Sequence, residues 1–144
     1  MSETAGKRGA KSRTILLVED NTTQALHLQA LLEQEGLKVI WANGGRIAVK
    51  MAQQFHPDLI VLDVQMPEMN GFQVCQQLKS RRDTADIPII MFTRHDDPEA
   101  VVLGLQTGAI DYISKDAFAD AVLLETLRQM GLIGSSSTEP DRAA

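Results

Sequence analysis

Short apolar runs, each long enough for one buried strand, recur along the chain and are separated by longer amphipathic stretches. Five such runs occupy residues 14–18, 38–42, 59–62, 87–92 and 110–113. The runs at 59–62 and 87–92 are almost continuously apolar, which is typical of strands in a parallel sheet that helices cover on both faces. The pattern therefore predicts five strands, with these two at the centre of the sheet.

The stretches between the runs show the three- and four-residue spacing of helices. Apolar residues recur in this way over 25–32, 48–55 and 74–78, and two further helices are expected over 97–108 and from about 116 to 130. Pro98 falls in the first turn of the fourth helix, and Gly108 stands where that helix ends. Strict alternation of strands and helices predicts an α/β fold with a doubly wound parallel sheet and right-handed crossovers.

Length and composition suit a single domain, which we expect to occupy residues 13–132 of the 144. A basic tail at 1–12 and a polar tail at 133–144 are expected to be disordered because they lack apolar periodicity. The net charge of -5 argues against a nucleic-acid partner. Since no apolar stretch approaches the ~20 residues of a membrane span and the lone Cys75 cannot form an internal disulfide, we expect a cytoplasmic protein without a membrane partner.

Polar residues stand at the carboxyl ends of four predicted strands. Glu19 and Asp20 follow the first strand, Asp63 follows the third, Thr93 follows the fourth and Lys115 follows the fifth. Ligands of doubly wound sheets bind beyond these ends. We therefore expect the five side chains to form one site.

Three carboxylates in one site repel one another and require a cation. Mg²⁺ fits this need because it binds one or a few carboxylates and keeps several waters. With that charge neutralised, Asp63 can act as a nucleophile toward a phosphoryl group, which Lys115 and Thr93 can hold by charge and hydrogen bonding. The pattern therefore predicts phosphoryl transfer.

The same residues resemble a known family motif. They are Glu19, Asp20, Asp63 within the segment 62–71, Thr93, Tyr112 and Lys115. Over about residues 13–130 the chain resembles the receiver domain of two-component response regulators, of the stand-alone chemotaxis type. The resemblance implies a flavodoxin-like five-stranded parallel sheet with the strand order 2-1-3-4-5.

By this resemblance, Asp63 is the phosphoacceptor and lies in a magnesium site. Asp20, Asp63 and the main-chain carbonyl of Gln65 would bind Mg²⁺, and Glu19 would assist largely through water. The phosphoryl group would come from a sensor histidine kinase or a histidine phosphotransfer protein. The chain would then be a signalling protein that takes part in its own phosphorylation and dephosphorylation, and not an enzyme with a separate substrate.

The other motif residues would hold and report the phosphoryl group. By resemblance, Lys115 and Thr93 hold its oxygens, and the rotamer of Tyr112 follows the state of Thr93. Two positions depart from the family pattern. Asp116 follows Lys115 where the family usually has proline, and Arg94 follows Thr93 where a small residue is common.

Three side chains flanking the site are expected to tune the lifetime of the phosphoryl group, namely Gln65, Arg94 and His95. They can block or order the water that must stand in line behind phosphorus. Arg94 could block that water, hold a phosphate oxygen or simply turn to solvent. The other histidines, His27 and His56, lie on separate elements without metal-ligand spacing and are expected at the surface.

The signalling surface is expected on the fourth helix, fifth strand and fifth helix. Apolar triplets at 101–103 and 122–124 fall on the two helices. Each triplet sweeps ~200° around its helix, so not every member can face the sheet. The remaining apolar area is available for an unknown downstream protein or for a second copy of the chain.

Three other interpretations remain open from the sequence. The acidic pair could merely cap the first helix. A small phosphatase would need a second acid two residues after Asp63, where Gln65 stands. A phosphorylation-independent interaction module would keep the receiver fold without its chemistry. Metal-dependent phosphorylation of the purified protein distinguishes these possibilities.

Overall fold

The computed structural model describes residues 12–134, so the predicted tails fall outside the described residues except at positions 12, 133 and 134. Its strands are β1 (Thr14–Val18), β2 (Lys38–Ala42), β3 (Leu59–Leu62), β4 (Ile89–Thr93) and β5 (Asp111–Ser114). They pair in parallel in the order β2-β1-β3-β4-β5. The predicted fold class and strand order are confirmed.

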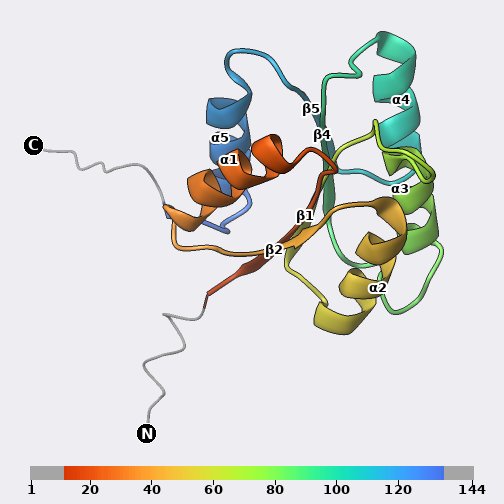
Figure 1. Cartoon of the computed structure of the whole chain (residues 1–144), viewed down its shortest axis with the longest axis horizontal. Helices are drawn as coiled ribbons and strands as arrows, with labels where there is room; N and C mark the ends of the chain where they lie inside the picture. Colours follow the sequence, from red (N-terminus) through yellow and green to blue (C-terminus); the bar gives the residue numbers. More distant parts are fainter. Residues whose placement is uncertain (1–11, 135–144) are drawn as a thin grey trace, which may run out of the picture.

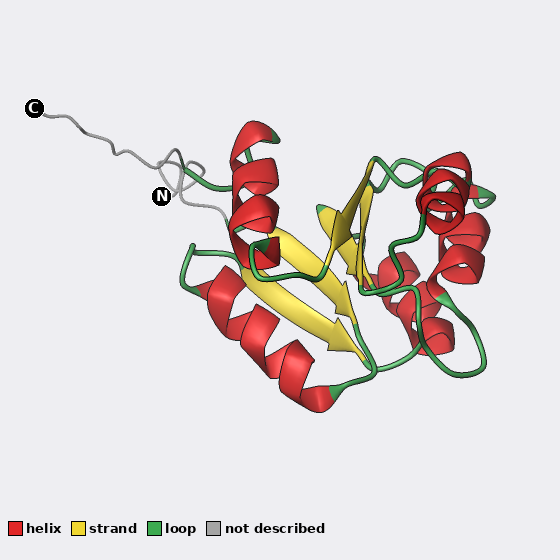
Figure 2. Ribbon diagram, turned by 90° about the horizontal axis from the view of Figure 1, so that it is seen from above, coloured by secondary structure: helices red, strands yellow, loops and turns green. Residues whose placement is uncertain are grey.

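A helix follows each strand. The helices are α1 (Thr22–Glu33), α2 (Gly45–Phe55), α3 (Gly71–Lys79), α4 (Pro98–Gln106) and α5 (Ala119–Gln129). Figures 1 and 2 show α1 and α5 on one face of the sheet and α2, α3 and α4 on the other. Since both faces are covered, the strands bury both of their sides, which explains their continuous apolar runs.

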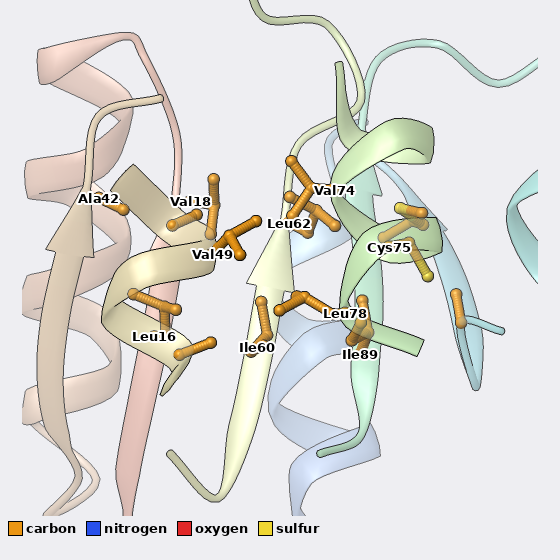
Figure 3. Close-up of a cluster of buried hydrophobic side chains, with 14 of the residues drawn as sticks. Leu16, Val18, Ala42, Val49, Ile60, Leu62, Val74, Cys75, Leu78 and Ile89 are labelled. Atoms are coloured by element: carbon orange, nitrogen blue, oxygen red, sulfur yellow. The ribbon is translucent and has the colours of Figure 1, made fainter. Parts of the chain in front are cut away.

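The sheet has two hydrophobic cores because alternate strand residues point to opposite faces. On the face of α2 and α3, Leu16 and Val18 pack with Ile60 and Leu62, and the helices contribute Val49, Val74, Cys75 and Leu78 (Figure 3). On the other face the core is formed by residues that include Ile15, Leu17, Val61, Leu28, Leu32, Leu123 and Leu127. These two cores fix the strands whose ends carry the site.

The start of β4 differs from the sequence pattern, which placed it at residue 87. The strand begins at Ile89 because Pro88 has no N–H with which to pair, and the Ile87 N–H instead donates to the Thr84 carbonyl. At its other end the strand takes in Thr93, which pairs with Ser114 of β5. A proline inside an apolar run therefore shifts the strand without changing its place in the sheet.

The start of α5 also differs from the expectation, which was Asp116. The Asp116 carboxylate accepts the Phe118 N–H at 2.8 Å and so forms a turn, and the helix begins at Ala119. Short polar side chains favour such turns over helix interiors.

The second core extends slightly beyond the expected domain end at residue 132. Ile133 is buried and packs with α1 and α5 residues such as Leu32 and Leu127. None of the helices within residues 12–134 is long and apolar enough to cross a membrane.

Candidate functional site

The ends of four strands bring the predicted site residues to one edge of the sheet. Glu19 and Asp20 come directly after β1, and Asp63 comes directly after β3. Strands β1 and β3 are neighbours in the sheet. Thr93 is the last residue of β4, and Lys115 follows β5. Because all five strands are parallel, these residues meet beyond the carboxyl ends.

Glu19, Asp20 and Asp63 form a compact acidic cluster. Each offers one carboxylate oxygen, and the three oxygens lie within 4.8 Å of one another. Glu19 and Asp63 are 2% and 8% exposed, whereas Asp20 is open to solvent. Three oxygen ligands with access to water suit a hard divalent cation such as Mg²⁺.

The Lys115 ammonium group lies among these carboxylates. Its Nζ donates to Glu19 Oε1 at 2.6 Å and to Asp63 Oδ2 at 3.1 Å, and also to Gln24 Oε1 at 2.6 Å. The same Nζ lies 5.8 Å from the centroid of the Phe92 ring. Lys115 therefore neutralises part of the acidic charge at the two buried carboxylates.

Burial and charge act against each other on Glu19. Burial raises the pKa of its carboxyl group above the usual range, and the Asp63 carboxylate raises that pKa further, while Lys115 lowers it. A buried carboxylate gains from a second cation, because a positive charge offsets both the lost hydration and the repulsion from its neighbour. The site thus favours added positive charge.

Asp116 does not prevent Lys115 from reaching the site. The Lys115 N–H donates to the Thr93 carbonyl at 2.9 Å, and the Asp116 N–H donates to the Ser114 carbonyl at 3.0 Å. No cis peptide bond occurs within residues 12–134. The Asp116 carboxylate forms a turn with the Phe118 N–H directly after the lysine, at the position where the resemblance led us to expect proline.

The loop after β3 holds the Asp63 carboxylate from its own main chain. The Gln65 N–H donates to Asp63 Oδ1 at 3.1 Å, so each carboxylate oxygen of Asp63 has a partner. Where the loop enters α3, the Gly71 N–H donates to the Val64 carbonyl at 2.9 Å. A Cβ at Gly71 would lie 2.4 Å from the Asp63 carbonyl oxygen, so the close approach requires glycine.

Thr93 and Tyr112 are linked through the loop after β4. The His95 N–H donates to Thr93 Oγ1 at 3.2 Å, and the Tyr112 hydroxyl donates to the His95 carbonyl. The Tyr112 ring packs on Gly104 of α4, where a Cβ would lie 2.7 Å from the ring. Burial, with the nearby negative charges of Asp97, Asp63 and Asp96, raises the pKa of Tyr112 to about 12.

The start of α1 answers the question whether the acidic pair merely caps that helix. The N-cap is Asn21, whose side chain accepts the Gln24 N–H at 2.9 Å. Glu19 supports the cap because its Oε2 accepts the Asn21 N–H at 3.1 Å, while its Oε1 pairs with Lys115. Glu19 therefore belongs both to the helix start and to the site.

Three neighbours of the site were not singled out from the sequence. Gln24 accepts from Lys115, Phe92 lies under the same ammonium, and the Trp41 indole donates to the Glu19 carbonyl at 2.7 Å. The pattern Asn-x-x-Gln, which opens α1, was a signal for Gln24, though it indicates a helix cap. Nothing in the local sequence places Phe92 or Trp41 against the site.

The flanking residues Arg94 and His95 differ in their surroundings. Arg94 is exposed and lines a cavity of about 350 Å³ beside Lys115, between the starts of α1 and α5. His95 is half-buried, its ring packs edge-to-face with the Phe72 ring at 6.2 Å between centroids, and its Nε2 lies 3.3 Å from an Asp97 oxygen.

The other two histidines lie away from the acidic cluster, in exposed pairs with carboxylates. His27 pairs with Asp120 at 2.5 Å, and His56 pairs with Asp86 at 3.2 Å.

Comparison with known proteins agrees with this geometry. A family model described as the response regulator receiver domain matches residues 15–128. The chain belongs to this family. It is a response regulator domain of two-component signal transduction.

The chain spans different shares of its curated relatives. Protein PilH of Pseudomonas aeruginosa is 38% identical over 109 residues, which make up 76% of this chain and 90% of PilH. The alkaline phosphatase synthesis transcriptional regulatory protein PhoP of Bacillus subtilis is 42% identical over 104 residues, and there the matched part is 72% of this chain and 42% of PhoP. The chain thus spans nearly all of one relative and less than half of the other.

Solved structures of receiver domains share the fold. The signal receiver domain of a signal transduction histidine kinase from Syntrophus aciditrophicus has a TM-score of 0.76 at 41% identity, covering 92% of this chain and 99% of that chain. The receiver domain of sensor histidine kinase PA1611 from Pseudomonas aeruginosa has a TM-score of 0.75 at 28% identity, and the match covers 83% of this chain and 97% of that chain. That structure contains a magnesium ion coordinated in its active site cleft.

Proposed function

We propose that Asp63 accepts a phosphoryl group from a phosphohistidine of a sensor histidine kinase or histidine phosphotransfer protein. The observation that carries this proposal is the 3.1 Å contact between Lys115 Nζ and Asp63 Oδ2 within a buried acidic cluster. An Asp63 carboxylate oxygen forms the new O–P bond as the donor P–N bond breaks. The bonding electrons leave with the imidazole, which takes a proton from solvent.

Lys115 and Thr93 would hold the phosphoryl oxygens in this reaction. Lys115 supplies a buried positive charge, which is worth more there than in water. Thr93 is fully buried, and its hydroxyl already accepts the His95 N–H of the loop after β4. A shift of Thr93 toward a phosphoryl oxygen would therefore move His95, and with it the Tyr112 hydroxyl that donates to the His95 carbonyl.

Mg²⁺ is the metal that the donor set fits best. Asp20, Asp63 and the main-chain carbonyl of Gln65 would bind it, with Glu19 assisting through water. When bound, the ion supplies charge neutralisation for the phosphoryl oxygens. The proposal is supported by the three carboxylate oxygens within 4.8 Å of one another and by the magnesium ion in the PA1611 receiver domain.

Labelling with a small phosphodonor tests the site. Purified protein incubated with acetyl phosphate and Mg²⁺ should gain one phosphoryl group in its intact mass, and Asp63→Asn should abolish the gain. The exposed residue Asp86 gives the matched control, because Asp86→Asn should label like the wild type.

Chelation of Mg²⁺ and the fate of the label complete this test. Labelling that persists undiminished in excess chelator would refute the metal requirement. Steady release of phosphate from an added monoester would favour the phosphatase, and failure to label would favour the interaction module.

Trp41 offers a direct reporter of metal binding. It is the only tryptophan of the chain, and its indole N–H donates to the main-chain carbonyl of Glu19. Titration with Mg²⁺ should therefore change its fluorescence, and Asp20→Ala should remove the change. An equal response in Asp20→Ala would place the metal elsewhere.

The output surface is proposed on α4, β5 and α5. Val102 and Leu103 of α4 are exposed, as are Ile110 before β5 and Val122 of α5. Tyr112 of β5 contacts α4 at Gly104 and is bonded to the loop after Thr93, so this surface is physically connected to the phosphorylation site.

A pair of charge substitutions tests the output surface. Val102→Glu with Leu103→Glu should abolish self-association, or the capture of a target protein, in the phosphorylated state. Leu26→Glu provides the control, because Leu26 is at least as exposed as Val102 and Leu103 but lies on α1. The placement is wrong if both proteins behave alike.

A further inference from the structure

Two helices of this chain begin with the same pattern, an asparagine followed three residues later by a glutamine. At α3 the pattern forms a complete capping box. Asn70 Oδ1 accepts the Gln73 N–H at 3.0 Å, and Gln73 Oε1 accepts the Asn70 N–H at 2.9 Å. Each side chain thus satisfies a main-chain donor of the other residue, which is the usual use of this pattern.

At α1 the glutamine does not return the contact. Asn21 Oδ1 accepts the Gln24 N–H at 2.9 Å, but the Asn21 N–H donates to Glu19 Oε2 at 3.1 Å. Gln24 Oε1 instead accepts from Lys115 Nζ at 2.6 Å. Because Glu19 replaces the glutamine at the cap, the helix start loses no hydrogen bond and the Gln24 side chain is free to contact the site.

This contact fixes the orientation of the Lys115 ammonium group. The group has three N–H donors, and it has three acceptors: Glu19 Oε1 and Gln24 Oε1 at 2.6 Å, and Asp63 Oδ2 at 3.1 Å. An ammonium nitrogen is tetrahedral, so fixing two N–H directions fixes the third. Glu19 and Gln24 together therefore aim the remaining N–H at Asp63.

We propose that Gln24 is a positioning residue for phosphoryl transfer, which anchors Lys115 so that one N–H faces the group on Asp63. This inference rests on the proposed function of Asp63 as phosphoacceptor. When Asp63 carries a phosphoryl group, the third N–H donates to a phosphoryl oxygen that lies in its path, while Glu19 and Gln24 keep the other two. A neutral amide suits this role, because a fourth carboxylate would add repulsion against an incoming phosphoryl group.

Three variants test the proposal. Gln24→Met keeps the length of the side chain and removes the acceptor, whereas Gln24→Glu keeps an acceptor oxygen. Gln73→Met is the matched control, because it removes the corresponding glutamine from the cap of α3 and has no contact with Lys115. Thermal unfolding of each variant confirms that it folds.

The first readout is the exchange of the Lys115 ammonium protons with water, followed by NMR and assigned by the loss of the signal in Lys115→Met. The second is the rate constant for labelling by acetyl phosphate with Mg²⁺. In Gln24→Met we expect proton exchange about tenfold faster and labelling about tenfold slower, the factor that corresponds to one hydrogen bond to a charged group. Gln24→Glu should keep proton exchange slow, and Gln73→Met should leave both readouts at the wild-type value.

Two outcomes would overturn the inference. Unchanged proton exchange in Gln24→Met would show that Gln24 does not hold the ammonium. Faster exchange with unchanged labelling would show that the contact does not serve the transfer. Failure of the wild type to label on Asp63 would instead refute the proposed function, and the exchange measurement separates the cases because it needs no phosphoryl group.

Discussion

Lys115 and Glu19 form a buried ion pair in which Nζ lies 2.6 Å from Oε1 and the side chains are 10% and 3% exposed. The pair belongs to a larger cluster, since Asp63 contacts the same Nζ. Burial and the Asp63 carboxylate raise the pKa of the Glu19 carboxyl group, whereas Lys115 lowers it, so this cation favours the ionised form. The ion pair thus links the stability of the domain to the charge of its site.

The first prediction concerns the loss of this cation. Lys115→Met should lower the free energy of unfolding by ~3 kcal/mol in metal-free buffer, because two buried carboxylates lose their partner. Urea unfolding measures the loss. Mg²⁺ should recover more stability in the variant than in the wild type, since it replaces the missing positive charge.

The control for this prediction is an exposed lysine. Lys50→Met on α2 should change the free energy of unfolding by less than ~0.5 kcal/mol and should not alter the effect of Mg²⁺. Equal losses in the two variants would contradict a special contribution of Lys115.

The second prediction concerns the close approach at Gly71. A Cβ there would lie 2.4 Å from the Asp63 carbonyl oxygen and 2.8 Å from Val64 Cα, both main-chain atoms that cannot rotate away. Gly71→Ala should therefore destabilise the domain by ~2 kcal/mol and slow the labelling of Asp63, because the loop must shift. Chemical unfolding and acetyl phosphate labelling measure the two effects.

Gly44 provides the comparison, because a Cβ there would meet nothing within 4 Å. Gly44→Ala should cost less than ~1 kcal/mol, the loss expected at a helix N-cap, and should leave labelling unchanged. If Gly71→Ala labelled as fast as Gly44→Ala, the loop would not be what holds Asp63 in place.

The third prediction uses Tyr112, the only tyrosine of the chain. Its phenol should ionise with a pKa of about 12 in the folded protein, above the usual value of 10. The folded state then keeps a proton that the unfolded state loses, so this group should lower stability progressively between pH 10 and 12. Ultraviolet absorbance of the phenolate follows the ionisation, and circular dichroism of the same samples confirms folding.

A charge variant identifies the cause of the shift. After burial, Asp97 is the largest contribution, so Asp97→Asn should move the Tyr112 midpoint toward lower pH. Asp86→Asn, which alters an exposed carboxylate that makes no contribution to this shift, should leave the midpoint in place. A wild-type midpoint near 10 would show that the ring is not held in the buried position.

The sequence predicted the architecture well because the apolar runs report burial on both faces. Thr93 and Lys115 could be placed from the strand ends alone, since parallel strands bring those ends together. Boundaries were less predictable because they depend on single groups. Because Pro88 lacks an N–H, β4 begins at Ile89 and not at residue 87. Because the Asp116 side chain forms a turn, α5 begins at Ala119.

Contacts between distant elements were beyond the sequence. The pattern from Asn21 to Gln24 indicates a capping box, and the same pattern forms one at α3. At α1 the glutamine contacts Lys115, 91 residues away, because Glu19 satisfies the cap in its place. The local sequence pattern indicates that Asn21 and Gln24 belong to one helix start. Only the fold shows that the Gln24 side chain contacts Lys115.

The last prediction concerns the lifetime of the phosphoryl group. Hydrolysis requires a water in line behind phosphorus, so a side chain that obstructs the approach slows it without touching Asp63. Arg94 follows Thr93 directly and lines the cavity beside Lys115, where its long cationic side chain can reach phosphoryl oxygens or fill the path of water. Arg94→Ala should therefore speed the loss of phosphate several-fold, which corresponds to ~1 kcal/mol in the barrier.

The measurement is the decay of the labelled intact mass after removal of acetyl phosphate. Arg82, which is also exposed but lies in the loop between α3 and β4, is the control, and Arg82→Ala should decay at the wild-type rate. Because Arg94 is not among the carboxylates that would hold the ion, the Trp41 response to Mg²⁺ should be the same in both variants. Equal decay in Arg94→Ala and Arg82→Ala, with that response intact, would show that Arg94 does not control the lifetime of the phosphoryl group.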